Sequence, residues 1–326
     1  MAVYTRLGAE DMAGIVAAFD VGTLISAKGI AEGVSNSNWL IETQDAKGEA
    51  HRFILTMYET RTDVSDLPFF LGLLDHLAAK QCPVPRTIHD RNGASYRLHE
   101  GKALALIEFL PGVSVSEPTA GQARAVGAAL AQVHLAATDF PDARENSMGL
   151  AAWQELLGAC GHDGLESIDP DLARLVEHEL PLIASHWPSN LPRSVIHADL
   201  FPDNVLMLGD RVTGLIDFYF ACTDVTAYDI AVTHAAWCFN ADGTAFRPEL
   251  SVALLEGYET VRPLLPEERA ALPILARAAA MRFLATRAYD WMNTPDDALV
   301  TPKDPMAFAR RLQFYADPVN EGIFAR

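Results

Sequence analysis

The stretch from residue 194 to residue 220, SVIHADLFPDNVLMLGDRVTGLIDFYF, limits what this chain can fold into more than any other. An apolar run leads into His197 and Asp199, and Asn204 follows five residues later. A Gly-Asp turn then reverses the chain, and a second apolar run ends at Asp217. Short apolar runs bounded by turn residues are typical of strands. The pattern therefore predicts a strand, a polar loop and a hairpin that bring these polar side chains near one another.

Asp199, Asn204 and Asp217 have the chemistry that transfer of a γ-phosphoryl group requires. The protein must orient an attacking hydroxyl, accept its proton and hold Mg²⁺ against the triphosphate. Asp199 is placed to be the base, while Asn204 offers a neutral oxygen and Asp217 a charged one, as Mg²⁺ prefers. Water and phosphate oxygens would complete the metal shell. We therefore expect ATP and Mg²⁺ as cofactors.

The same stretch resembles the catalytic segment of the kinase-like phosphotransferases, H-x-D-x-x-x-x-N followed by D-F at the end of a hairpin. Tyr219 stands where protein kinases have glycine, which is usual in the small-molecule branch of aminoglycoside phosphotransferases, choline kinases and homoserine kinases. The resemblance implies that His197 joins Asp199 in the catalytic set, more to brace the loop than to carry protons. It also implies that Asp229, in the run Tyr-Asp-Ile-Ala, braces this loop from a following helix.

The resemblance implies a fold as well. This is an α+β, protein-kinase-like two-lobed fold, with a small antiparallel-sheet N-lobe that carries a helix and a larger, mainly helical C-lobe. The chain would divide into a nucleotide-binding lobe (1–107), a hinge (108–112) and a catalytic and acceptor-binding lobe (113–326), with ATP between the lobes. A length of 326 residues is sufficient for such an enzyme.

Charge and cysteine content narrow the class of partner. The chain has 25 basic and 43 acidic residues, a formal charge of −18, which argues against nucleic acid and anionic membranes as partners and suits a cationic substrate. The four cysteines show no C-x-x-C pairing, as expected of reduced thiols. We find no signal peptide and no apolar run of membrane-spanning length. A cytoplasmic enzyme is the simplest prediction.

The N-terminal part predicts a helix over 8–19, followed by a hairpin with strands at 21–27 and 39–43. The turn between these strands, residues 28–38, contains two glycines. Ahead of the catalytic segment, a glycine-containing turn favours a role in covering phosphates. The candidate nucleotide contacts in this turn are Lys28, Gly29, Gly33 and Asn38.

The predicted third strand, residues 51–58, lacks the lysine that holds the α- and β-phosphates in kinase-like enzymes. Thr56 stands in its place, and the next predicted helix, 66–80, has no glutamate where the lysine's partner would fall. This departure, together with the runs F-I-L-T and D-L-P-F-F-L-G-L, closely resembles bacterial homoserine kinases. Lys28 and Arg52 are the nearest candidates to meet the charge of the triphosphate.

A strand over 103–109 ends in Glu-Phe-Leu-Pro-Gly, where proline and glycine turn the chain away. A shorter strand, 95–98, precedes it across an E-G-K turn. By resemblance, the segment after these strands is the hinge. The carbonyl of Glu108 and the amide of Leu110 would then form hydrogen bonds with adenine, although a plain interdomain turn would need the same residues.

Beyond the hinge the apolar spacing becomes helical. One helix is predicted over 119–136 with Thr119 as its cap, and 266–280 and 281–291 are predicted as separate helices.

Homoserine is a zwitterion, so its site requires a carboxylate for the ammonium group and a cation for the carboxylate. The candidate acceptor contacts are Asp203, Arg282, Arg287 and Trp153, with Asp229 as an alternative carboxylate.

The resemblance to homoserine kinases implies an ATP- and Mg-dependent enzyme that converts L-homoserine to O-phospho-L-homoserine, a step toward threonine. One alternative is a related small-molecule kinase acting on an aminoglycoside, choline or a sugar such as methylthioribose. Another is a non-catalytic nucleotide-binding module, which the missing lysine and glutamate make conceivable. The intact set of Asp199, Asn204 and Asp217 argues against that second alternative.

Overall fold

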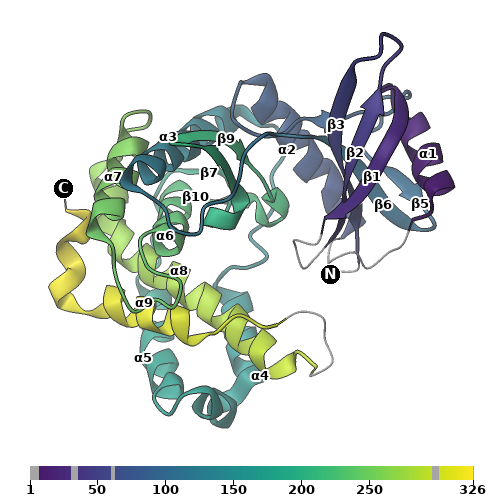
Figure 1. Ribbon diagram of the computed structural model, residues 1–326. Helices are drawn as coiled ribbons and strands as arrows, with labels where there is room; N and C mark the ends of the chain where they lie inside the picture. The colour runs from purple at the N-terminus through teal and green to yellow at the C-terminus, as the bar shows by residue number, and fades with distance from the viewer. Residues whose placement is uncertain (1–6, 31–35, 60–62, 296–300, 326) are drawn as a thin grey trace. The chain divides into compact units, whose positions relative to one another are not determined.

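The computed structural model describes residues 7–30, 36–59, 63–295 and 301–325. The chain divides into two compact units, the first ending at Pro111 and the second beginning at Gly112 (Figure 1). The first is built around a β-sheet, and the second consists mainly of helices. This composition confirms the predicted α+β class.

In the first unit, the strands form an antiparallel sheet in the order β1-β2-β3-β6-β4, and β5 pairs with β6. Its α-helices lie within the predicted ranges 8–19 and 66–80 and fill most of each, so both helix predictions are confirmed. The elements are α1 (Ala9–Ala17), β1 (Thr23–Ile30), β2 (Asn36–Gln44), β3 (Ala50–Tyr58), α2 (Leu67–Ala79), β4 (Thr87–Ile88), β5 (Arg97–His99) and β6 (Lys102–Glu108).

α1 and the residues just after it pack on one face of this sheet. Met12, Ile15, Val16 and Phe19 follow the spacing of a single helical face, and all four are buried. Successive side chains of a strand point to opposite faces, so this stripe meets alternate residues of β2, β3 and β6. These are Trp39, Ile41, Leu55, Met57, Leu104 and Leu106.

The two strands beside the glycine-containing stretch are longer than the sequence predicts. β1 continues through Lys28 and Gly29, and β2 already includes Asn38. These three residues therefore lie in paired strands and not in the turn, because cross-strand hydrogen bonds extend both strands beyond their apolar runs. Gly33 lies outside the described residues.

In the described part of the second unit, two short antiparallel pairs, β7–β10 and β8–β9, lie among the helices (Figure 1). None of the helices in the described residues has both the length and the apolarity that crossing a membrane needs. The strands are β7 (Arg193–Ile196), β8 (Val205–Leu208), β9 (Arg211–Leu215) and β10 (Cys222–Val225). The helices are α3 (Ala120–Ala136), α4 (Leu150–Ile168), α5 (Leu172–Ser185), α6 (Thr226–Trp237), α7 (Pro248–Glu259), α8 (Pro266–Asn293) and α9 (Met306–Ala316).

Two of these helices show where local signals suffice and where they fail. α3 begins at the predicted cap, because the Thr119 hydroxyl accepts from the amide of Gln122 (3.2 Å) and the Gln122 side chain accepts from the amide of Thr119 (3.0 Å). α8, in contrast, is one continuous helix where the sequence predicts two. It packs against α4, α6 and α9 along its length, and this tertiary support keeps it continuous.

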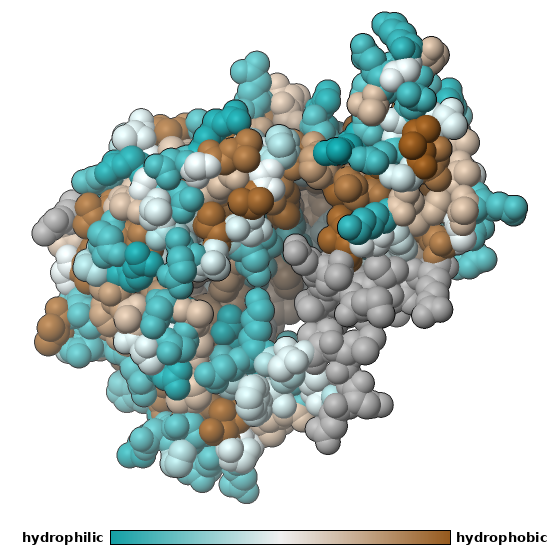
Figure 2. Space-filling model, in the orientation of Figure 1, coloured by the Kyte–Doolittle hydropathy of each residue, from teal (hydrophilic) through white to brown (hydrophobic). Residues whose placement is uncertain are grey.

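The surfaces of both units are chemically mixed. Hydrophilic and hydrophobic residues are interspersed over the face shown in Figure 2. The exposed large apolar side chains are scattered along the whole chain, from Ile25 to Val319. Single exposed apolar residues are normal on protein surfaces, so these residues need no partner to explain them.

Candidate active site

The catalytic segment brings its polar residues together through the backbone. β7 leads into the loop, and the β8–β9 hairpin ends just before Asp217. The side-chain amide of Asn204 donates to the carbonyl oxygen of Asp199 (2.8 Å) and lies 3.4 Å from its carboxylate Oδ2. The carbonyl of Asn204 accepts from the amide of Ile216 (3.0 Å). Asp199, Asn204 and Asp217 therefore lie on adjoining parts of one hydrogen-bonded loop and hairpin.

This arrangement provides oxygen ligands for a cation. Asn204 uses its side-chain nitrogen as the donor to Asp199, so its Oδ1 is the atom able to bind a metal. An amide oxygen and a carboxylate are both ligands that suit Mg²⁺. Asn204 and Asp217 could therefore hold the metal, with Asp199 beside it.

The electrostatics of the segment also fit a cation. Burial raises the pKa of Asp199 to about 7; Arg282 opposes this shift, and the charges of Asp217 and Asp203 add to it. Burial likewise raises the pKa of Asp217 to about 6, with a further contribution from Asp203. Asp217 nevertheless keeps an exposed side. A divalent cation at these carboxylates would favour their charged forms, so the donor set is suited to a metal.

Asp229, on α6, holds the catalytic loop in place. Its carboxylate accepts from the backbone amides of His197 and Ala198, both at 2.7 Å, and from the imidazole of His134 at 2.9 Å. Burial alone would raise the pKa of Asp229, but the hydrogen bond and charge of His134 hold it below its usual range. Asp229 is fully buried, so it braces the loop and does not reach an acceptor.

His197 uses both of its ring nitrogens inside the protein. Nε2 lies 2.9 Å from the carbonyl of Ile216, which can only accept, so Nε2 carries the proton. Nδ1 then accepts from the amide of Asp199 (3.2 Å). Burial lowers the pKa of His197, which keeps the imidazole neutral. These contacts fit the loop-bracing role that the resemblance implies for His197, and not proton transfer.

Two of the predicted acceptor contacts are buried in the second unit. Trp153 is 0% exposed, and its indole N–H donates to the carbonyl of Met148 (2.6 Å). Arg282 is 2% exposed, and its guanidinium donates to the carbonyl of Ala198. Neither side chain has the exposed surface that a direct acceptor contact needs. Both predictions are corrected, because elements distant in the sequence cover these residues.

The other two predicted acceptor contacts, Asp203 and Arg287, are charged side chains near Asp199. Asp203 forms an ion pair with Lys303 (3.6 Å). Burial lowers the pKa of Arg287 to about 10, while the nearby charges of Asp203 and Asp199 favour its charged form, so Arg287 is a cation at neutral pH. Lys303 could not be predicted from the sequence, because no motif marks a lysine so far along the chain as a neighbour of Asp203.

In the first unit, the candidate nucleotide contacts of the sheet differ in their surroundings. Arg52 forms an ion pair with Glu42 (3.0 Å), so its charge is already matched. Asn38 accepts at its side-chain oxygen from the hydroxyl of Thr56 (2.8 Å), the residue that replaces the kinase lysine. Lys28 is exposed on β1. The structure therefore favours Lys28 over Arg52 as a cation for phosphates.

The segment after β6 holds the two predicted adenine contacts. β6 ends at Glu108, whose carboxylate forms an ion pair with Arg86 (3.1 Å). Leu110 follows in an irregular stretch and is half-buried. The Glu108 side chain is thus tied to the first unit, and only its backbone carbonyl remains a candidate for adenine.

A lysine–glutamate pair does occur in the first unit, in a different place from the kinase pair. Lys102, at the start of β6, lies 2.5 Å from the carboxylate of Glu59, which follows β3. Glu59 also accepts from the hydroxyl of Ser37 (2.7 Å). The kinase pattern places the lysine within the third strand and the glutamate in the next helix, so the sequence did not predict this pair.

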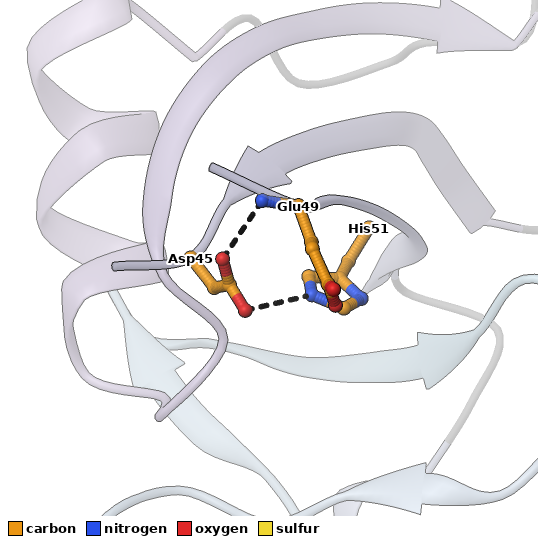
Figure 3. A group of neighbouring side chains, drawn as sticks. All are labelled: Asp45, Glu49 and His51. Atoms are coloured by element: carbon orange, nitrogen blue, oxygen red, sulfur yellow. Dashed lines mark hydrogen bonds and ion pairs between the residues drawn. The ribbon is translucent and has the colours of Figure 1, made fainter. Parts of the chain in front are cut away.

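A further group of metal-ligating residue types lies at the β2–β3 hairpin. Asp45, Glu49 and His51 point toward one another, with one ligand atom from each within 4.8 Å of the others (Figure 3). The carboxylate of Asp45 accepts from the amides of Lys47 and Glu49, both at 2.8 Å, and lies 3.6 Å from His51. Aspartate commonly closes turns through such bonds. We therefore assign this group to the hairpin turn.

Comparisons with known proteins identify the relatives of this chain. The model of the phosphotransferase enzyme family matches residues 26–264. A curated homoserine kinase of Azorhizobium caulinodans is 49% identical over 315 residues, covering 97% of this chain and 96% of the relative. Another, from Parvibaculum lavamentivorans, is 46% identical over 328 residues and covers 100% of both chains.

Solved structures share the fold at much lower identity. An amicoumacin kinase in complex with AMP-PNP and Ca²⁺ has a TM-score of 0.68 at 17% identity, over 95% of this chain and 93% of that one. A spectinomycin phosphotransferase in complex with ADP and spectinomycin has a TM-score of 0.69 at 12% identity, over 98% of both chains. Both likenesses concern the fold alone, and they confirm the predicted protein-kinase-like architecture.

Proposed function

Because this chain belongs to the phosphotransferase enzyme family, we propose that it transfers the γ-phosphoryl group of ATP to the hydroxyl of L-homoserine, with Mg²⁺ as cofactor. The choice of acceptor is supported by relatives named homoserine kinase that are 46–49% identical over nearly their whole length. The observation that carries the chemistry is the grouping of Asp199, Asn204 and Asp217 on one hydrogen-bonded loop and hairpin. The product would be O-phospho-L-homoserine.

In the proposed reaction, Asp199 accepts a hydrogen bond from the homoserine hydroxyl and aims its oxygen at the γ-phosphorus. As that oxygen bonds to phosphorus and the bond to the ADP oxygen breaks, the hydroxyl proton passes to Asp199. Asn204 and Asp217 would hold Mg²⁺, which neutralises phosphate charge when bound. Asp229 and His197 keep the loop in position through their hydrogen bonds.

The proposal assigns nucleotide binding to residues 1–107, the hinge to 108–112, and catalysis and acceptor binding to 113–326. Within the first part, Lys28 is the preferred cation for the phosphates because its charge is exposed. The other proposed nucleotide contacts are Gly29, Gly33, Asn38, the carbonyl of Glu108 and the amide of Leu110.

The charged ends of homoserine match the groups around Asp199. Asp203 offers a carboxylate to the ammonium group, while Lys303 and Arg287 offer cations to the carboxylate. Asp203 and Lys303 pair with each other at 3.6 Å, so a bound zwitterion would exchange one ion pair for two. Choline and aminoglycosides have no carboxylate to bind these cations. This charge pattern favours an amino acid over those alternatives.

The test is Mg-ATP-dependent release of ADP by the purified protein with L-homoserine, L-serine, choline, methylthioribose and kanamycin as acceptors. We expect release with L-homoserine, and its loss in Asp217→Ala because a charged metal ligand is removed. Release with another acceptor only would keep the phosphotransfer chemistry and discard the substrate. No release with any of the five would contradict the proposed function.

Substitution of Lys303 should weaken the acceptor site. A hydrogen bond to a charged group contributes about 1.5–3 kcal/mol, so Lys303→Ala should lower kcat/KM for L-homoserine about 10- to 100-fold, mainly through KM. KM for ATP should stay the same. Homoserinol, which lacks the carboxylate, should be a poor substrate for the wild type. Lys303→Ala should lower kcat/KM for homoserinol little further.

Lys47→Ala is the matched control for this prediction, since Lys47 is a lysine in the β2–β3 turn of the first unit. Its kinetics should equal those of the wild type. If Lys303→Ala reduced homoserine and homoserinol turnover by the same factor, Lys303 would not be recognising the carboxylate.

A further inference from the structure

Ala198, between His197 and Asp199, has a backbone conformation that alanine rarely adopts. Its φ is +64°, in the left-handed region, where the Cβ of an L-residue crowds the following carbonyl oxygen. Glycine has no Cβ and enters this region without that penalty. Such strain persists only where neighbouring groups hold it, and it is often found at functional sites.

Buried side chains hold the peptide groups on both sides of Ala198. Its N–H donates to Oδ1 of Asp229 (2.7 Å), and its carbonyl accepts from the guanidinium of Arg282. That carbonyl belongs to the same peptide unit as the N–H of Asp199, which donates to Nδ1 of His197 (3.2 Å). Arg282 and His197 therefore fix opposite ends of the peptide that leads into Asp199.

Arg282 reaches this carbonyl from α8, and its surroundings keep its charge in place. It is 2% exposed. Its guanidinium carbon lies 4.6 Å from the ring centre of Phe283 and 5.4 Å from that of Phe220, which follows Asp217 closely in the chain. Cation–π contacts stabilise a desolvated guanidinium. Arg282 thus contacts both the Ala198 carbonyl and the segment after Asp217.

We propose that Arg282 is a positioning residue, which binds the Ala198 carbonyl, keeps Ala198 in the left-handed conformation and so aims the carboxylate of Asp199. The inference rests on the proposed function, in which Asp199 accepts the hydroxyl proton. Relaxation of Ala198 to negative φ would rotate the peptide before Asp199. It would also displace the Asp199 carbonyl from the amide of Asn204. Arg282 acts through these residues and touches neither substrate.

A double-mutant cycle of Arg282→Met and Ala198→Gly tests this role. Methionine keeps an unbranched apolar side chain against the aromatic rings but cannot donate to the carbonyl. We expect Arg282→Met to lower kcat at saturating ATP and homoserine about 10- to 100-fold, as a misplaced catalytic group does, with little change in either KM. In the Ala198→Gly background the same substitution should cost about 5- to 30-fold less, because glycine needs no help to stay left-handed.

Arg277→Met is the matched control, because Arg277 lies on the same helix and pairs with Glu179 (2.8 Å) instead of the catalytic loop. It should leave kcat unchanged even if it lowers stability. An equal loss of kcat from Arg282→Met in the Ala198 and Ala198→Gly backgrounds would mean that Arg282 only fills the core. Normal kcat in Arg282→Met would also overturn the inference. If thermal unfolding shows that Arg282→Met does not fold, Arg282→Leu, which also lacks a donor for the carbonyl, takes its place in the cycle.

Amide hydrogen exchange over residues 197–199 gives a readout that needs no acceptor. Arg282→Met should speed this exchange relative to the wild type, and Arg277→Met should not. A wild type that fails to phosphorylate homoserine would contradict the proposed function, while the exchange data would still decide the role of Arg282. A wild type that phosphorylates homoserine, with both kcat and exchange insensitive to Arg282→Met, would contradict only the positioning role.

Discussion

Asp199→Asn is expected to lower kcat for phosphorylation of L-homoserine by about 10²- to 10⁴-fold, the range for loss of a positioned base. The amide has almost the shape of the carboxylate, but it cannot take the hydroxyl proton. The loop should stay in place, because Asn204 and His197 bind the backbone of Asp199. KM for ATP should therefore change little. Steady-state kinetics with an ADP-coupled assay would measure both parameters.

Asp203→Asn is the matched control, since Asp203 is a second carboxylate in the same loop and is proposed to bind the acceptor's ammonium group. It should raise KM for homoserine and affect kcat much less than Asp199→Asn. A kcat of Asp199→Asn within about tenfold of the wild type would exclude Asp199 as the base.

Asp229→Ala is expected to lower the free energy of unfolding by about 3–5 kcal/mol, the cost of removing one partner from a buried charged network. The substitution leaves the amides of His197 and Ala198 and the imidazole of His134 without their acceptor. Unpaired buried donors cost about 1–3 kcal/mol each. Urea unfolding of wild type and variant would measure the difference. The catalytic loop would also lose its anchor, so turnover should fall with stability.

The matched control is Asp171→Ala in the same unit. Asp171 is 71% exposed and pairs with Arg174, which is 77% exposed. Surface ion pairs of this kind contribute about 0–1 kcal/mol, so this variant should unfold almost as the wild type does. Equal stability of Asp229→Ala and Asp171→Ala would contradict the view that Asp229 supports the fold of the loop.

Elements with short-range signals were predictable from the sequence. The α3 start depends on Thr119 and Gln122, which are three residues apart. The turn before β6 uses Glu100 and Gly101, both with positive φ, as tight hairpins prefer. α1 follows from apolar spacing within a single helix. In each case the residues that cause the structure are close neighbours in the chain.

Predictions that depended on pairing between distant segments were less accurate. Lys28, Gly29 and Asn38 were predicted in a turn, but strand pairing places them in the sheet. The break predicted between residues 280 and 281 is absent, because the packing of α8 against other helices outweighs weak local signals. Tertiary contacts routinely override local propensity at the ends of elements.

The fold class could be predicted from the sequence, and so could the candidate set of Asp199, Asn204 and Asp217, because their types and spacing suit the proposed chemistry and lie in one loop and hairpin. Asp229, on α6, was predicted from the resemblance alone. The cations near this set could be identified only from tertiary contacts. Arg282 is buried against the Ala198 carbonyl, while Lys303 pairs with Asp203. These contacts join segments about 80 to 100 residues apart in the sequence. Local patterns do not reveal such contacts, because they form only when whole helices pack together.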